Sequence, residues 1–313
     1  MGNKPVSDAP HIPVLLAEVL ESLRVANLPN GVFIDGTLGA GGHTAAILAA
    51  APDTHVLGFD RDPRSLAVAQ ARLDSYAARV QFIHGSYDTM FACAAEHHIA
   101  AVDGILLDIG ISSMHVDDVS RGFSFRQDAP LDMRFDVLNT HQSAADLVNT
   151  CTADELADIF YKYGEEHDSR RLARAVIAAR PLHTTRQLAA VIESHTHPKA
   201  RSDTLARIFQ ALRIAVNDEL GMLERVLPQA IKLLKPTGRL AVISFHSLED
   251  RIVKDYFKLE ATDCICPPKQ LVCTCGHRAS IRLVTRKPIT PSQAEIAANP
   301  RSRSAKLRVA EKI

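Results

Sequence analysis

Residues 31–43 decide the fold, and they read Gly-Val-Phe-Ile-Asp-Gly-Thr-Leu-Gly-Ala-Gly-Gly-His. The apolar residues 32–34 predict a short buried strand, which ends in the acid Asp35. A glycine-rich turn at residues 36–43 leads into an alanine-rich helix predicted over residues 44–51. Such a turn lets backbone N–H groups at a helix start approach a ligand closely. A tight turn without a ligand is the alternative, although so many glycines at one junction cost conformational entropy.

The alternation of strand and helix continues on both sides of this turn. Apolar runs predict further strands at residues 55–60, 80–85, 102–108, 239–245, 281–285 and 306–310. Helical spacing of apolar residues predicts helices at residues 14–23, 63–76, 220–234 and 248–259. Near-continuous apolar strands that alternate with helices are typical of a parallel sheet covered on both faces. The predicted fold class is therefore α/β, with a doubly wound, mostly parallel sheet.

The alternation stops after the strand predicted at residues 102–108. No strand pattern is found from residue 116 to residue 215, and helical patterns occupy residues 152–163, 169–179, 185–194 and 202–216. The sequence therefore predicts an all-helical domain at 116–215. This domain is inserted into a main domain made of residues 1–115 and 216–313.

The sequence shows no membrane-spanning segment and no secretory signal. Its net charge gives no indication of a nucleic-acid partner. The 313 residues are 46% hydrophobic, and both Lys+Arg and Asp+Glu number 36. No apolar run reaches the length of about eighteen residues that a membrane span requires. Residues 1–13 lack the basic segment followed by an apolar run that marks a secretory signal. The expected location is the cytoplasm.

Acids follow three of the predicted strands and indicate which cofactor the glycine-rich turn binds. Asp35, Asp60 and Asp108 stand at strand ends, where open α/β sheets bind ligands, and residues 36–43 contain no Lys or Arg. This pattern favours the cationic, phosphate-free cofactor S-adenosylmethionine, with Asp35 facing its amino-acid moiety and Asp60 its ribose hydroxyls. Two alternatives stay open. NAD oxidoreductases use a similar turn, and each acid is also a good cap for the following helix.

Ten motifs, in order along nearly the whole chain, match one known family. They include Asp-Gly-Ile-Leu-Leu-Asp-Ile-Gly-Ile-Ser-Ser at 103–113 and Ile-Ser-Phe-His-Ser-Leu-Glu-Asp-Arg at 243–251. The others lie at residues 11–16, 34–43, 58–63, 121–125, 130–134, 163–166, 209–217 and 299–304. By these motifs the chain resembles the ribosomal RNA small-subunit methyltransferase H family, also called MraW.

The resemblance implies a function, a cofactor site and a partner. It implies a methyltransferase-type fold with a helical insertion, and methylation of a cytidine N4 in 16S ribosomal RNA of the small ribosomal subunit. The residues that it implies for S-adenosylmethionine binding are Gly41, Gly42, His43, Asp60, Tyr87, Asp108 and His115. Tyr87 stands where the family commonly has Phe, and Met114-His115 stands where it commonly has Pro-Gln. A DNA or small-molecule methyltransferase on the same fold and a non-catalytic RNA-binding module stay open as alternatives.

The chemistry of a cytidine N4 sets the choice of catalytic candidates. Its lone pair is delocalised into the ring, so the enzyme must align the reactants and offer a polar acceptor for the departing proton. The candidates are Asp108, Ser112, Ser113, Asp132 with its neighbour Arg134, and His246. A capped turn is the alternative for the two serines, and a helix N-terminal residue bonded to backbone is the alternative for His246.

Two stretches of the chain are locally basic. Residues 169–213 and residues 278–312 each contain nine Lys or Arg and two Asp or Glu. Both stretches could contact RNA phosphates, whereas a solvated helical face is the ordinary explanation. The oligomeric state stays open, with a homodimer as one alternative.

Four of the six cysteines form a cluster near the end of the chain. Cys264, Cys266, Cys273 and Cys275, flanked by His277, could together bind one zinc ion. The Cys-x-Cys spacing is tighter than the Cys-x-x-Cys of common zinc sites. A reduced hairpin with buried thiols is the alternative.

Overall fold

The protein consists of two compact units. The computed structural model describes residues 13–267, 270 and 272–313, and only the backbone of Ser113. The first unit, here called the sheet unit, comprises the described parts of residues 1–110 and 222–313. The second, here called the helical unit, comprises residues 111–221. Among the described residues, every helix is too short or too polar to cross a membrane.

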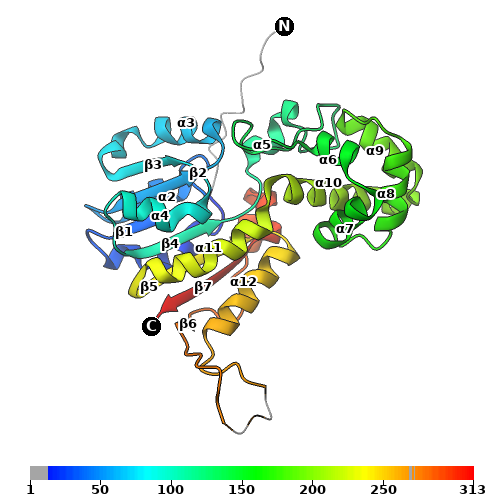
Figure 1. Cartoon of the computed structure of the whole chain (residues 1–313). Helices are drawn as coiled ribbons and strands as arrows, with labels where there is room; N and C mark the ends of the chain where they lie inside the picture. The colour runs from blue at the N-terminus through cyan, green and yellow to red at the C-terminus, as the bar shows by residue number, and fades with distance from the viewer. Residues whose placement is uncertain (1–12, 268–269, 271) are drawn as a thin grey trace. The chain divides into compact units, whose positions relative to one another are not determined.

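The described residues of the sheet unit form a sheet of seven strands in the order β3-β2-β1-β4-β5-β7-β6 (Figure 1). The strands are β1 (Val32–Asp35), β2 (His55–Asp60), β3 (Val80–His84), β4 (Val102–Asp108), β5 (Leu234–Ser244), β6 (Ile281–Leu283) and β7 (Lys306–Lys312). Strands β1 to β5 pair in parallel, and β7 runs antiparallel to both of its neighbours. The predicted α/β class with a mostly parallel sheet is confirmed.

Helices cover both faces of this sheet. Successive side chains of a strand point to opposite faces, so each strand contributes to the core on either side. One face packs on α1 (Leu16–Ser22), α2 (Gly42–Ala50) and α3 (Pro63–Arg72), and the fully buried Phe33 of β1 belongs to this core. The other face packs on α4 (Met90–Glu96), α11 (Glu219–Leu233) and α12 (Ser247–Glu260), and Ile34 of β1 belongs to this second core. A short helix, α13 (Gln293–Ala298), precedes β7.

The helical unit has a hydrophobic core of its own. Its helices are α5 (Ser113–Asp117), α6 (Ala144–Thr150), α7 (Ala153–Gly164), α8 (Ser169–Ala178), α9 (Thr185–Ser194) and α10 (Arg201–Asn217). Phe160, Leu172, Leu188 and Ile208 are fully buried in it. Capping boxes begin α6, α7 and α9, and they explain why these helices start where they do. The predicted helical insertion is confirmed.

The structure also corrects several predicted elements. Strand β5 begins at Leu234 instead of residue 239, and residues 235–238 lie inside it as a bulge, with Thr237 at a φ of 65°. Strand β6 ends at Leu283 instead of residue 285. The short helices α4, α6 and α13 were not predicted, because six or seven residues give too few turns for a helical period to stand out.

Candidate active site at the carboxyl edge of the sheet

Three acids end neighbouring parallel strands of the sheet unit. Asp35 ends β1, Asp60 ends β2 and Asp108 ends β4, and β1 pairs with both β2 and β4. Because parallel strands end on the same edge, the three carboxylates lie along one edge of the sheet, as predicted. The strand order reverses between β1 and β4, which is where open α/β sheets place their ligands.

The glycine turn, residues 36–43, has a shape that most side chains would disturb. Gly41 has a φ of 75°, in the left-handed region. A Cβ on Gly42 would lie 2.6 Å from Cγ of Pro13, so the chain passes too closely there for any side chain. Asp60 holds the turn from the next strand, since its Oδ2 accepts a 2.8 Å hydrogen bond from the Gly39 amide. These contacts fix the backbone of the turn before any ligand binds.

The Asp35 carboxylate bonds both the glycine turn and the helix that follows it. Its carboxylate is buried, and it accepts hydrogen bonds from the amide of Thr37 at 3.1 Å and from the hydroxyl of Thr44 at 2.7 Å. Burial raises the pKa of Asp35 to about 6, although both hydrogen bonds act to lower it. Asp35 ties the glycine turn to α2. The expectation that it faces the cofactor's cationic moiety stays a prediction.

Asp108 lies in a more unusual environment. Its amide donates a 2.6 Å hydrogen bond to Oγ1 of Thr37, and its Oδ2 lies 3.7 Å from Nδ1 of His43. Its Oδ1 is buried and has no hydrogen-bond partner among the described residues. Burial raises the pKa of Asp108 to about 6; His43 acts to lower it, and the nearby carboxylates of Asp35 and Glu249 raise it further.

The His43 ring lies beside the Asp108 carboxylate. The His43 ring is buried, and its Nε2 lies 2.9 Å from the carbonyl oxygen of Val14. A carbonyl only accepts, so Nε2 must carry a hydrogen. Nδ1 is then the ring nitrogen that faces the Asp108 carboxylate.

The unpartnered oxygen of Asp108 is the observation that tests whether S-adenosylmethionine fits. A buried polar atom without a partner costs about 1–3 kcal/mol, so a hydrogen-bond donor or a cation is favoured at this position. Tyr87 lies beside the glycine turn: a Cβ on Gly36 would come within 3.1 Å of the Tyr87 Cβ. A carboxylate edge with an aromatic beside it suits a cationic ligand that carries a flat base, and it does not suit a pyrophosphate. The residues present fit S-adenosylmethionine.

His246 caps the helix that follows β5. Its amide donates to Oε2 of the buried Glu249 at 3.2 Å, and its Nε2 lies 3.0 Å from Oε1 of the same residue. The Phe245 amide donates to the same Oε2 at 2.8 Å. His246 thus stands in the capping position that was its alternative interpretation. Glu249 was not predicted, although its position three residues after His246 is the signal of a capping box.

Ser112 and His115 belong to the helical unit and contact each other. Ser112 caps α5, with its Oγ 3.1 Å from Nδ1 of His115. The buried His115 ring packs against Phe123 and Phe135, with centroid distances of 5.4 and 4.8 Å. The side chain of Ser113 lies outside the described part of the structure.

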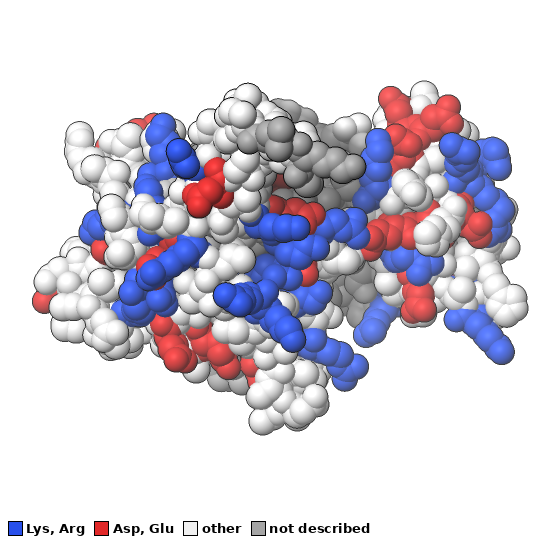
Figure 2. Space-filling model, turned by 90° about the horizontal axis from the view of Figure 1, so that it is seen from below, with Lys and Arg blue, Asp and Glu red and all other residues white. Residues whose placement is uncertain are grey.

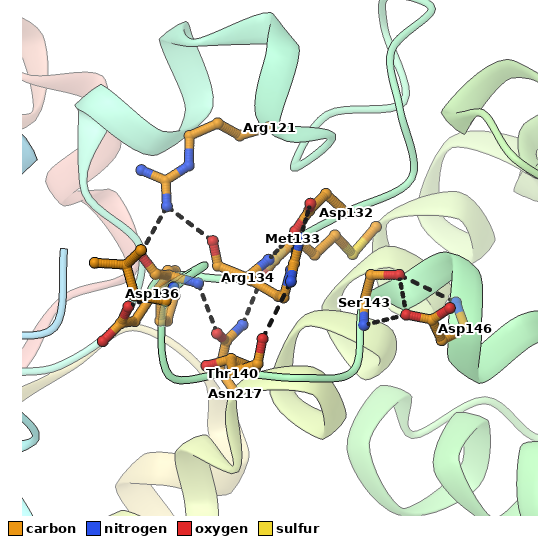
Figure 3. Close-up of polar contacts among 11 residues, drawn as sticks. Arg121, Asp132, Met133, Arg134, Asp136, Thr140, Ser143, Asp146 and Asn217 are labelled. Carbon is orange, nitrogen blue, oxygen red and sulfur yellow. Dashed lines mark hydrogen bonds and ion pairs between the residues drawn. The ribbon is translucent and has the colours of Figure 1, made fainter.

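Asp132 is locked into an ion pair. Its two oxygens accept from Nε and Nη2 of Arg134 at 2.8 and 2.7 Å (Figure 3). Burial alone would raise the pKa of Asp132, but the hydrogen bonds and charge of Arg134 outweigh burial and lower it. A carboxylate held in this way is a weaker base than a free one.

Two further side chains hold the loop around Asp132 from outside (Figure 3). Arg121 donates from Nη2 to the carbonyls of Arg134 and Phe135, both at 2.8 Å. Asn217, the last residue of α10, accepts from the Phe135 amide at 2.8 Å and donates to the Met133 carbonyl at 2.7 Å. Neither clamp was predicted, because both act across long sequence separations.

The predicted site residues fall into both units. The sheet unit contains Gly41, Gly42, His43, Asp60, Tyr87, Asp108 and His246. The helical unit contains Ser112, the backbone of Ser113, His115 and Asp132. The residues that sequence reasoning missed are Thr37, Thr44, Arg121, Asn217 and Glu249.

Comparison with known proteins gives a family. The MraW methylase family matches residues 8–313. Ribosomal RNA small subunit methyltransferase H of Citrifermentans bemidjiense is 51% identical over 316 residues, covering 98% of this chain and all of that protein. The protein of the same name from Dehalococcoides mccartyi is 49% identical over 310 residues, covering 98% of this chain and 88% of that protein. A solved rRNA methylase from Streptococcus thermophilus spans 94% of this chain and 95% of its own at 10% identity, with a TM-score of 0.43 that adds nothing to the assignment. Because the family match and both relatives span nearly the whole chain, the protein belongs to the MraW methylase family, as its motifs indicate.

Proposed function

We propose that this protein transfers a methyl group from S-adenosylmethionine to N4 of a cytidine in the 16S ribosomal RNA of the small ribosomal subunit, in the cytoplasm. The relatives carry the name of small-subunit rRNA methyltransferases, which supports the substrate class. The observation that carries the proposal is the buried, unpartnered oxygen of Asp108 beside the glycine turn.

Each proposed cofactor residue contacts a different part of S-adenosylmethionine. S-adenosylmethionine supplies a methyl group that its sulfonium already activates. Gly41 and Gly42 allow backbone to approach, Tyr87 offers a ring to the adenine, and Asp60 offers a carboxylate to the ribose hydroxyls. Asp60 suits that role because the amides of Gly39 and Asp62 hold its two oxygens in place at 2.8 Å. His115, which the resemblance also implies, belongs to the helical unit and stays a prediction.

Asp108 is the proposed acceptor at the reacting end. With a pKa of about 6, its carboxylate is mostly ionised at neutral pH, yet it takes up a proton more readily than an ordinary Asp. Nδ1 of His43 lies 3.7 Å from it and faces it from the glycine turn. Alignment of the two reactants contributes the larger part, since well-oriented reactions gain about 7–11 kcal/mol.

The helical unit is the proposed substrate-recognition domain. Because Arg134 lowers the pKa of Asp132, we assign Asp132 the task of positioning Arg134 rather than of accepting a proton. Asn217 and Arg121 keep that loop rigid. Ser112 and Ser113 stay as candidates for contact with the target base, and His246 stays as a candidate that now also has a capping role.

Exposed arginines of the helical unit are the proposed phosphate contacts. Arg170 and Arg174 lie one turn apart on α8, and Arg186 lies on α9; all three are exposed. Other basic residues of the same stretch are bound internally, such as Arg207 to Glu166 at 2.6 Å and Arg213 to Glu219 at 2.8 Å. Figure 2 shows basic and acidic side chains interspersed on the face that it presents, so RNA contact must be local rather than an effect of net charge.

Mass mapping of ribosomal RNA tests the proposal directly. RNA from cells with and without the protein is digested, and methylated cytidines are located by mass. We expect one N4-methylated cytidine in 16S RNA to disappear with the protein. Transfer of labelled methyl to isolated subunits, naked ribosomal RNA and DNA then identifies the substrate form.

The cofactor is tested separately by calorimetry. Titration with S-adenosylmethionine should release or absorb heat with one site per chain, and NAD should give none. Tight binding of NAD without binding of S-adenosylmethionine would overturn the proposal. An unchanged pattern of cytidine methylation in cells without the protein would do the same.

A further inference from the structure

A loop between α12 and β6 brings four thiols together without packing them in a core. This cysteine loop, residues 261–280, carries Cys264, Cys266, Cys273 and Cys275. Their four Sγ atoms all lie within 4.8 Å of one another. Cys264 and Cys273 are exposed, so the alternative of a hairpin with buried thiols does not describe the structure.

The spacing of the sulfur atoms matches a tetrahedral metal site. Sγ of Cys273 lies 3.5, 4.0 and 3.6 Å from those of Cys264, Cys266 and Cys275, and Cys264 lies 3.8 Å from Cys275. A zinc ion bound to four thiolates at about 2.3 Å places the sulfurs about 3.8 Å apart. A disulfide would require about 2.05 Å, so no pair of these cysteines is bonded to another.

The base of the loop is fixed, whereas two apolar side chains among its described residues are exposed. Ser280 donates from its amide to the carbonyl of Glu260 at 2.8 Å, and Nε2 of His277 lies 3.1 Å from the carbonyl of Leu259. Beyond this base, Ile265 and Val272 are 49% and 72% exposed. A segment that buries so little apolar surface needs another source of stability, such as a metal or a disulfide.

We propose that these four cysteines bind one zinc ion that folds the cysteine loop. As the four Zn–S bonds form, the four thiols release their protons to solvent. Four protein ligands leave no open position on the metal, so the site is structural and takes no part in methyl transfer. His277 stays outside the set, because its Nε2 faces the Leu259 carbonyl. The amide of Thr274, 3.4 Å from Sγ of Cys266, donates to a ligand sulfur as amides around zinc commonly do.

Elemental analysis of the purified protein is the first test. The full chain is prepared without an affinity tag or added metal, under a non-thiol reductant, and compared with a Cys264→Ser/Cys273→Ser variant. A Cys93→Ser/Cys151→Ser variant is the matched control, since these two cysteines lie outside the loop. We expect one zinc per chain in the wild type and the control, and at least tenfold less in the loop variant. Absence of zinc from the wild type, iron in its place, or equal zinc in all three proteins would overturn the proposal.

Limited proteolysis tests the structural role independently of enzyme activity. Zinc is released from the wild type with a mercurial thiol reagent and a chelator, and the reagent is then reversed with a reductant. We expect the metal-free protein to be cut within residues 261–280 at least tenfold faster, while the rest of the chain stays intact, and added zinc to restore protection. Equal cleavage with and without zinc would show that the metal does not fold the loop. Neither result depends on whether the protein methylates RNA.

Discussion

The half-buried carboxylate of Asp108 destabilises the fold at neutral pH, because the folded protein holds the carboxyl proton more tightly than the unfolded chain does. The stabilising contribution is fully present below the unfolded pKa of 3.8 and is lost as the pH rises through the folded value of about 6. At about 1.4 kcal/mol per pKa unit, this difference corresponds to roughly 3 kcal/mol. The site thus keeps a costly charge where the proposed reaction needs one.

An Asp108→Asn variant should therefore be more stable than the wild type at pH 7.5, by roughly 3 kcal/mol. The amide keeps the shape of the side chain and can donate to Nδ1 of His43. The gain should vanish below about pH 3, where Asp108 is protonated in both the folded and the unfolded state, and methyl transfer at pH 7.5 should be lost. Urea unfolding followed by circular dichroism measures the difference, with the exposed Asp74→Asn as control. A gain that does not change with pH contradicts this account.

At the scale of elements, the segment between α5 and α6 shows how side chains replace regular structure. Gly122 has a φ of 72°, and Met133 has a φ of 63°. The guanidinium of Arg121 and the amide of Asn217 bond the backbone of residues 133–135. The segment is thus held by hydrogen bonds to its backbone rather than by a strand or helix ladder.

A Gly122→Ala substitution should destabilise the helical unit by more than about 3 kcal/mol. An L-residue at this φ costs about 1–2 kcal/mol, and the new Cβ would also clash with the carbonyl oxygen of Pro130. Gly39→Ala is the matched control, because Gly39 has a φ of 53° but space for a Cβ, so only the backbone cost of about 1–2 kcal/mol applies. Thermal unfolding measures the loss of stability in each of the two variants. Equal losses would mean that the clash with Pro130 relaxes freely.

Elements whose structure is set by neighbouring residues could be predicted from the sequence. The turn at residues 36–43 and helix α9 depend on neighbouring residues, and both were predicted closely. The acids ending β1, β2 and β4 were located for the same reason. The buried state of Asp35 and the clamp from Asn217 were missed, because each depends on contacts between residues far apart in sequence. The bulge in β5 was also missed, since residues 235–238 include Pro and Gly and look like a turn before the strand predicted at 239–245.

At the scale of the whole molecule, equal numbers of basic and acidic residues leave no net charge for long-range attraction to RNA. Affinity must then come from local contacts with phosphates. Arg170 and Arg174 are the best candidates, because both are exposed and, among the described residues, no acidic partner is recorded for either.

A double variant Arg170→Glu/Arg174→Glu should weaken RNA binding at least tenfold. The logarithm of the association constant should also fall less steeply with the logarithm of the salt concentration, by about 1–2 in slope. Binding of S-adenosylmethionine should not change. Lys254→Glu/Lys258→Glu is the matched control, since these exposed lysines are also one turn apart, on α12 of the sheet unit. Filter binding at a series of salt concentrations measures the affinity of each variant for RNA and its salt dependence. Equal weakening by the two variants would show that total charge, and not α8, determines affinity.

The order of the strands has a consequence for the growing polypeptide. Strand β7 lies between β5 and β6 in the sheet but follows both in sequence, so β5 exposes an unpaired flank and β6 has no neighbour until residues 306–312 have been translated. Unpaired flanks of this kind associate readily with other chains. Each nascent copy therefore passes through an interval in which its central sheet is unfinished, and slow translation beyond β6 would prolong its exposure to aggregation.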